Sequence, residues 1–226
     1  EHLKNPSLKE IKKYFYKYYI PNNMSMILAG DFQMDQTIAL VDQYFGDWAS
    51  KEIPDFSYAP EVPRTTIEEY NVTSPDEESM AIGFLMPNQN DKEAIIADLV
   101  GSILYNGKSG LIDKNLVKNQ KVLSAFGFTY LLKDYGMMYF GGNPLENQSL
   151  KEVKNLVIEQ IEHIKSGNFD EDLIKASINN LKVQRIKEQE SATNMAFVLN
   201  DLFAVNRSWD NYLRSMDDMN KITKRM

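Results

Sequence analysis

The chain has 226 residues, of which 43% are hydrophobic and 25% are charged, and its formal net charge is −7. These values are typical of a globular protein with one large domain, or with one domain and part of another. Lysine and arginine are interspersed with acidic residues and form no basic stripe, so no nucleic-acid partner is expected. The absence of cysteine excludes disulfides, thiolate nucleophiles and cysteine-bound zinc.

The two ends of the sequence suggest a segment of a longer protein. The chain begins with Glu1 instead of methionine, and Ile222-Thr223 near its end resembles the start of a further element. No apolar run approaches the roughly 20 residues that a membrane-spanning helix needs. A signal peptide or an anchor in the longer protein would therefore not be visible in this sequence.

The first expected elements are a helix, a turn, a strand and a second helix. Ser7 is a good N-cap with Glu10 three residues later, and apolar residues follow at helical spacing. Pro21 ends this helix. Residues 24–32 are mostly apolar and predict a strand buried on both faces, and Asp35 opens a helix that closes near Trp48. One strand cannot form a sheet alone, so residues 1–48 are expected to expose an unpaired edge or an apolar face.

Residues 49–64 contain three prolines among polar residues and are the best linker candidate. They separate residues 1–48, the expected tail of a preceding domain, from residues 65–226, the expected second domain. The elements expected in the second domain are strands at 65–72, 80–86, 122–132 and 136–143 and helices at 91–105, 111–119, 149–167, 170–190 and from 192 to the end. This order predicts an α+β fold with helices on one face of a largely antiparallel sheet.

Metal-binding side chains are scarce. The only histidines are His2 and His163, whereas a catalytic zinc normally takes three protein ligands. Glu159, Glu162 and His163 share a helix and form the one local trio, but a solvated helix face is the preferred interpretation. Glu1-His2 resembles the end of a His-x-x-Glu-His motif, yet a newly capped helix follows it at Ser7, whereas such a motif lies within a continuing helix. We therefore predict no metal ligands and no catalytic residues in this chain.

The segment Asn106-Gly107-Lys108-Ser109-Gly110 contains glycine and lysine but does not predict a phosphate-binding loop. It lacks the Gly-x-x-x-x-Gly-Lys spacing and follows a helix, whereas a phosphate-binding loop follows a strand. We interpret it as a glycine stop between two helices. The sequence also has no Gly-x-Ser-x-Gly motif of a serine hydrolase.

Several segments together resemble the pitrilysin/insulinase family of zinc metallopeptidases. Tyr18-Tyr19-Ile20-Pro21-Asn22-Asn23-Met24 and the apolar run to Phe32 resemble the end of that family's first domain. Residues 107–111, Gly-Lys-Ser-Gly-Leu, resemble the turn into a short helix in its second domain. The order and spacing of the strands and helices agree over nearly the whole chain.

The resemblance implies a chamber enclosed by two similar halves, each with two α/β domains. One domain carries His-x-x-Glu-His and a downstream glutamate on zinc, and the glutamate of the motif activates the attacking water. The second domain is usually non-catalytic. In some members, such a domain in the opposite half grips the substrate with an arginine and, seven residues on, a tyrosine. Val117 and Ser124 occupy those positions here, and Tyr130 has no arginine at the right spacing, so no substrate-binding residue is assigned.

These features lead to the hypothesis of a non-catalytic, chamber-forming domain of a zinc metalloendopeptidase, inactive by itself, with zinc in the parent protein and none in this segment. Its expected partners are the catalytic domain of the same chain or of a sister subunit, a peptide substrate and, through residues 1–48, a second copy. One alternative is a scaffold or partner subunit of the same family that has lost protease activity. Another is a self-contained hydrolase using carboxylates. The compartment is left open, with a bacterial periplasm or cell envelope favoured.

Overall fold

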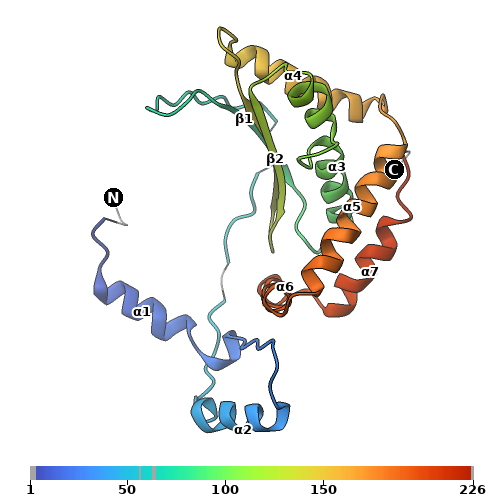
Figure 1. Cartoon of the computed structure of the whole chain (residues 1–226). Helices are drawn as coiled ribbons and strands as arrows, with labels where there is room; N and C mark the ends of the chain where they lie inside the picture. The colour runs from blue at the N-terminus through green and yellow to red at the C-terminus, as the bar shows by residue number, and fades with distance from the viewer. Residues whose placement is uncertain (1–3, 56, 63–64, 225–226) are drawn as a thin grey trace. The chain divides into compact units, whose positions relative to one another are not determined.

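A computed structural model describes residues 4–55, 57–62 and 65–224 (Figure 1). The chain forms two compact units, Glu1–Val72 and Thr73–Met226, and each is described by itself. Glu1 and His2 lie outside the described residues, so the structure does not place them. The expected functional division, with a tail to residue 48 and a linker at 49–64, stays a prediction.

The first unit contains α1 (Leu8–Tyr18), a short 3₁₀-helix η1 (Pro21–Asn23) and α2 (Met34–Phe45). The Ser7 hydroxyl caps α1 by accepting a hydrogen bond from the Glu10 amide at 3.4 Å. Proline suits the first position of the 3₁₀ turn because its ring fixes φ and it needs no hydrogen bond there. The predicted end of the first helix before Pro21 is thus observed.

Each of the two asparagines of this turn forms side-chain hydrogen bonds with the backbone of another segment. Asn23 donates from Nδ2 to the carbonyl of Tyr18 at 2.9 Å and so satisfies a carbonyl at the end of α1. Asn22 binds the backbone of Lys51 twice, donating from Nδ2 to its carbonyl at 2.8 Å and accepting from its amide at 3.2 Å. The Pro-Asn-Asn segment therefore ends one helix and ties the chain to a segment 29 residues downstream.

The strands predicted at 24–32 and 65–72 are not formed. Residues 24–32 run without ladder pairing, and in the second segment Ile67, Tyr70 and Val72 are 78 to 89% exposed. A strand is stable only when neighbouring strands pair with its amides and carbonyls. The apolar patterns are present, but the described residues of this unit provide no partner strand.

The first unit exposes apolar side chains, as expected from the missing neighbours. The exposed large hydrophobic residues on its helices and on the segment between them are Leu8, Ile11, Tyr14, Phe15, Tyr16, Tyr19, Met24, Met26, Leu28, Phe32, Met34, Ile38, Leu40, Tyr44 and Phe45. On α2, Ile38 and Phe45 are exposed at 53% and 40%.

The second unit has the predicted order of elements. Its strands are β1 (Met80–Met86), β2 (Ser124–Leu131) and β3 (Gly136–Asn143), and its helices are α3 (Ala94–Leu104), the π-helix η2 (Asp113–Lys118), α4 (Leu150–Lys165), α5 (Asp172–Gln189), α6 (Ala192–Ala204) and α7 (Trp209–Met219). The last helical region, expected as one run, is divided. Asn206 adopts φ +55°, and the Ser208 hydroxyl caps α7 at the Asn211 amide.

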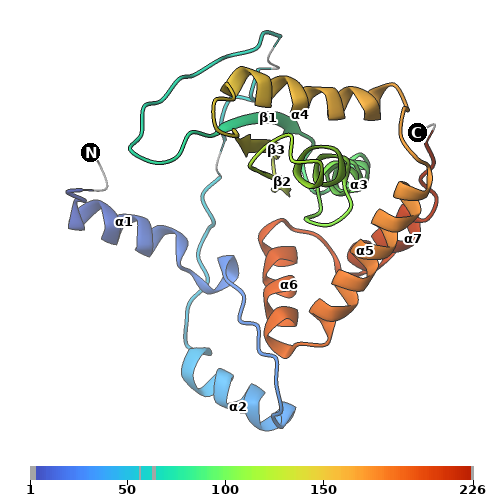
Figure 2. The same cartoon turned by 45° about the horizontal axis from the view of Figure 1, so that its top comes forward.

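The three strands form an antiparallel sheet in the order β1-β3-β2. Helices α3 and α4 lie on one face of this sheet, as Figures 1 and 2 show. The predicted α+β fold, with an antiparallel sheet and helices on one face, is therefore confirmed.

The core lies between the sheet and these helices. Phe140 of β3 is fully buried, and Val153 and Val157 of α4 are fully buried as well. Leu116 of η2 and Ile112 before it complete this cluster. The Ser149 hydroxyl and the Glu152 side chain form a reciprocal capping box at the start of α4. This cap fixes where α4 begins and so which of its residues enter the core.

Candidate functional site

The carboxylate and histidine trio of α4 does not form a metal centre. His163 Nε2 lies 3.9 Å from Glu159 Oε1, while the Glu162 carboxylate accepts a hydrogen bond from Lys165 Nζ at 2.6 Å. The other ring nitrogen of His163 lies 3.3 Å from Asn168 Nδ2. In the part of the chain that the structure describes, no group of three or more His, Cys, Asp or Glu side chains is placed to hold a metal ion. A zinc ion of the kind found in catalytic sites does not fit these residues.

The positions aligned with the family's arginine and tyrosine, Val117 and Ser124, make structural contacts within the second unit. Val117 lies in η2 and packs, partly buried, against the core. Ser124 begins β2, and its hydroxyl donates to Asn143 Oδ1 at 2.8 Å. That the family's substrate-gripping pair is missing here stays a prediction from the sequence.

The glycine-containing turn between α3 and η2 uses its amides internally. Asp113, which is buried, accepts from the amides of Asn106 and Gly110, each at 3.0 Å. Asn106 Oδ1 accepts from the amides of Lys108 and Ser109 at 3.1 and 2.9 Å. Amides already occupied in this way cannot cradle a phosphate, which agrees with the interpretation of this segment as a helix stop.

The face of the sheet opposite α3 and α4 is a candidate surface. We call it the open face and define it by six residues: Leu85, Phe126, Phe128, Tyr130, Met137 and Tyr139. Successive side chains of a strand alternate between faces, and directly paired residues share a face. In β3, Met138 and Phe140 are buried in the core, so Met137 and Tyr139 lie on the opposite side.

The pairing register places these side chains in rows across the sheet. Met137 pairs with Leu85 on one side and Tyr130 on the other, and all three are 43 to 59% exposed. Tyr139 pairs with Phe128, and their ring centroids lie 5.1 Å apart. The open face therefore presents adjacent aromatic and aliphatic side chains on a hydrogen-bonded backbone.

Gly141 explains how a third ring joins this surface. A methyl group at Gly141 would lie 2.5 Å from Phe126 Cζ, so the Phe126 ring occupies the space where a side chain would stand. This ring stacks on Tyr139 at a centroid distance of 5.8 Å with planes 25° apart. Offset stacking of this kind is a favoured arrangement of aromatic pairs. The glycine thus allows three rings to form one connected row.

A partly buried charged cluster lies on the helical side of this unit and was not predicted. Asp98 is the only charged residue of α3 and faces Arg185 of α5 and Arg207 of the α6–α7 turn. Arg185 donates from Nη1 to the carbonyl of Tyr212 at 3.1 Å and to Ser215 Oγ at 2.8 Å, and its Cζ lies 4.3 Å from the centre of the Tyr212 ring. These contacts join α5 to α7.

Burial raises the pKa of Asp98 to about 6, an effect that the charges of Arg185 and Arg207 only partly oppose. Burial and the charge of Arg185 lower the pKa of Arg207. A single aspartate within an otherwise apolar helix was the available sequence signal. The residues that surround it come from elements more than 85 positions away, so no local pattern indicated the cluster.

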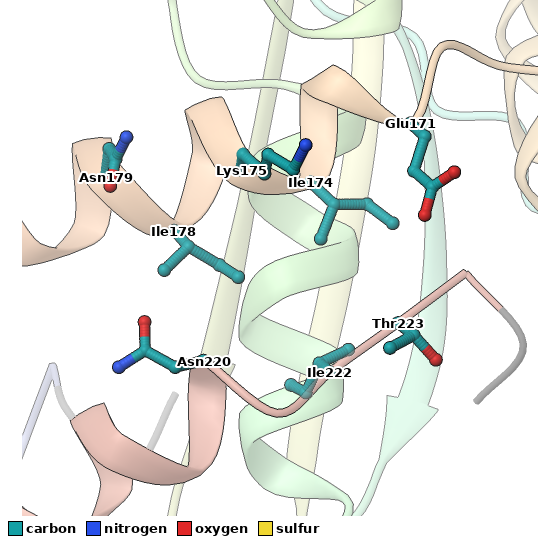
Figure 3. A pocket seen from close by; sticks show the side chains of 8 residues that line it. All are labelled: Glu171, Ile174, Lys175, Ile178, Asn179, Asn220, Ile222 and Thr223. Atoms are coloured by element: carbon teal, nitrogen blue, oxygen red, sulfur yellow. The ribbon is translucent and has the colours of Figure 1, made fainter.

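A hollow of about 440 Å³ lies between α5 and the segment that follows α7 (Figure 3). Glu171, Lys175 and Asn179 line it from α5 and the residue before it, and Asn220 and Thr223 line it from the C-terminal segment. Lys175 is also paired with Asp172 at 3.5 Å. The lining brings together no acid–base pair or nucleophile with its base, so it carries no catalytic assignment.

Together these observations define an α+β domain with one covered sheet face, one open face and no metal centre among its described residues. A model of the family described as the peptidase M16 inactive domain matches residues 6–181. The chain therefore belongs to this family. The match confirms the resemblance to pitrilysin/insulinase-type metallopeptidases, and it confirms the assignment of a non-catalytic domain.

Known relatives agree with this assignment. The zinc protease PqqE of Helicobacter pylori is 26% identical over 212 residues, which cover 90% of this chain and 47% of that protein. The structure of a protease from Helicobacter pylori superimposes on 98% of this chain with a TM-score of 0.90 and 21% identity. A peptidase M16 inactive domain from Pseudomonas fluorescens covers 97% with a TM-score of 0.76 and 16% identity. The chain spans about half the length of these relatives.

Proposed function

We propose that this chain is the chamber-forming, non-catalytic part of a zinc metalloendopeptidase whose zinc is bound by another part of the parent protein. The observation that carries the proposal is the one-sided sheet. Helices α3 and α4 cover one face, and the other presents a continuous apolar surface that no helix of this unit is seen to cover (Figure 2). Such a sheet suits a wall that separates a helical exterior from an interior where peptides are handled.

The first unit supports an assignment as the end of a preceding catalytic domain. Its two helices expose Leu8, Ile11, Ile38 and Leu40, whereas isolated domains normally bury residues of this kind. In the proposal, residues 1–48 pack into a catalytic domain of the same chain or of a sister subunit, and residues 49–64 are the connection to the domain that follows. The unpaired segment 24–32 would gain strand neighbours there.

The test compares the 226-residue chain with the full-length parent protein. The chain alone is expected to show no peptide hydrolysis and no tight zinc binding, whereas the parent hydrolyses peptides and loses activity when a chelator removes zinc. The upstream sequence should contain His-x-x-Glu-His some 100 or more residues before Glu1. Chelator-sensitive peptide cleavage by the 226-residue chain alone would overturn the proposal.

The same experiment distinguishes a protease from the alternative, a scaffold or partner subunit. A parent protein without the zinc motif that forms a stable complex but cleaves no peptide would be such a subunit. The described residues of this chain are compatible with either parent because they contain no metal centre. The difference between the two therefore rests on the residues of the preceding domain.

A further inference from the structure

The open face has a chemistry that restricts what it can bind. None of the residues of β1, β2 or β3 is Asp, Glu, Lys, Arg or His. Within these strands, the exposed side chains therefore offer apolar area and aromatic rings but no countercharge. A charged ligand side chain would lose water on this surface without gaining an ion pair, which disfavours its binding.

The dimensions of the open face suit a short extended peptide. Strands of up to eight residues are about 26 Å long at about 3.3 Å per residue, and three strands about 4.8 Å apart span about 14 Å. An extended chain of about eight residues therefore fits along the length of this face.

The spacing of the rows agrees with the geometry of an extended chain. Same-face rows of the sheet repeat every second residue, which corresponds to about 6.7 Å. An extended peptide repeats its own side chains on one face at the same interval. A peptide with apolar side chains at every second position can thus place each of them against a row, for example one on Phe128 and Tyr139 and the next on Tyr130 and Met137.

We propose that the open face binds extended, uncharged peptide segments that carry aromatic or large aliphatic side chains at alternate positions. This inference rests on the proposed function, since it assigns the substrate class that such a chamber wall contacts. Phe128 and Tyr130 are the residues expected to determine the preference, because their rings are 49% and 59% exposed. Phe126 and Tyr139 hold the row in place through their stacking.

The test uses fluorescence anisotropy of labelled peptides with the 226-residue chain. The first probe alternates phenylalanine with glycine, the second has the same composition with phenylalanines three positions apart, and the third replaces phenylalanine by glutamate. Only the first is expected to bind well, and its Kd should change less than about twofold between low and high salt because no ion pair is involved. Equal binding of the first two probes, or strong salt dependence, would contradict the proposal.

Variants of the chain identify the surface. Phe128→Ser and Tyr130→Ser should each weaken binding of the alternating peptide about fivefold, as expected for losing half of a buried aromatic side chain. Phe197→Ser on α6 is the matched control, because its ring is 64% exposed but lies off the sheet, and it should bind like the unmodified chain. Circular dichroism verifies that each variant is folded. If the two sheet variants bind as tightly as the control, the open face is not the binding surface.

Three further outcomes separate a failure of this inference from a failure of the proposed function. Light scattering of the chain reports whether a second copy covers the open face, in which case dimerisation would be lost in Phe128→Ser and the peptide proposal would be wrong. Peptide binding at the open face in a parent that proves to be a scaffold would leave this inference intact and refute only the protease assignment. A parent that cleaves peptides while both sheet variants bind normally would refute only this inference.

Discussion

Replacing Asp98 by asparagine should stabilise the second unit at neutral pH. Asp98 lies partly buried on α3, and burial raises its pKa from 3.8 to about 6 despite the nearby Arg185 and Arg207. A raised carboxyl pKa means that the folded state binds the proton more tightly than the unfolded state does. Stability from this group is therefore present below about pH 4 and is lost as the pH rises through 6. Asparagine has nearly the same side-chain shape as aspartate but carries no charge.

The magnitude follows from the two pKa values. A difference of about two units corresponds to about 3 kcal/mol between the fully protonated and fully ionised limits. Between pH 5.0 and pH 7.5, the part that changes is roughly 1 kcal/mol, because the unfolded aspartate is already ionised at pH 5.0. The benefit of Asp98→Asn should therefore be roughly 1 kcal/mol larger at pH 7.5 than at pH 5.0. The effects of Arg185 and Arg207 are already contained in this pKa, and Asp98 is mostly protonated at pH 5.0 in the folded state.

Urea denaturation at the two pH values measures this difference. Trp48→Phe provides the background, because Trp209 then becomes the only tryptophan and reports on α7, where it stacks on Tyr212 at 5.1 Å. Asp201→Asn, at an exposed position of α6, is the control. The reasoning fails if the effect of Asp98→Asn is the same at both pH values or is larger at pH 5.0. Either result would mean that the arginines, and not burial, dominate the titration of Asp98.

Two further predictions concern the core and a helix cap. Phe140→Ala should lower the free energy of unfolding by about 3–5 kcal/mol, because the Phe140 ring is fully buried between the sheet and α4. Phe128→Ala on the open face should lower it by less than about 1 kcal/mol. Similar losses for the two variants would show that the two faces are misassigned. Ser149→Ala should lower stability by about 1 kcal/mol in thermal or urea unfolding, since it removes the acceptor for the Glu152 amide in the capping box. An unchanged midpoint would show that the cap contributes nothing.

Local signals in the sequence were sufficient for most of the second unit. Alternation and the turn at residues 133–136 indicated the β2–β3 hairpin, and β1 was predicted with its observed bounds. Serine caps and helical spacing located α4, and Gly167 marks its end with φ +68°. These elements were predictable because each depends on residues that lie within a few positions of one another.

The two absent strands show where this reasoning fails. Residues 24–32 are mostly apolar like β1, and residues 65–72 alternate like a strand. Of these three segments only β1 pairs with another strand, which is β3, 56 residues along the chain. A strand depends on hydrogen bonds to a distant segment, and the residues of the strand do not indicate whether that segment is available to pair with it. The segment 65–72, with Ile67 at 89% exposure, is the clearest example.

The sequence by itself determined the helices, the hairpin, the family and the lack of a local metal motif. These properties depend on residue types at short spacing. The tertiary structure decided which face of the sheet is covered, and it brought Asp98 to Arg185 and Arg207. It also placed the rings of Phe126, Phe128 and Tyr139 in one row. Burial and cross-strand pairing join residues that are far apart in the chain, and only the folded arrangement specifies them.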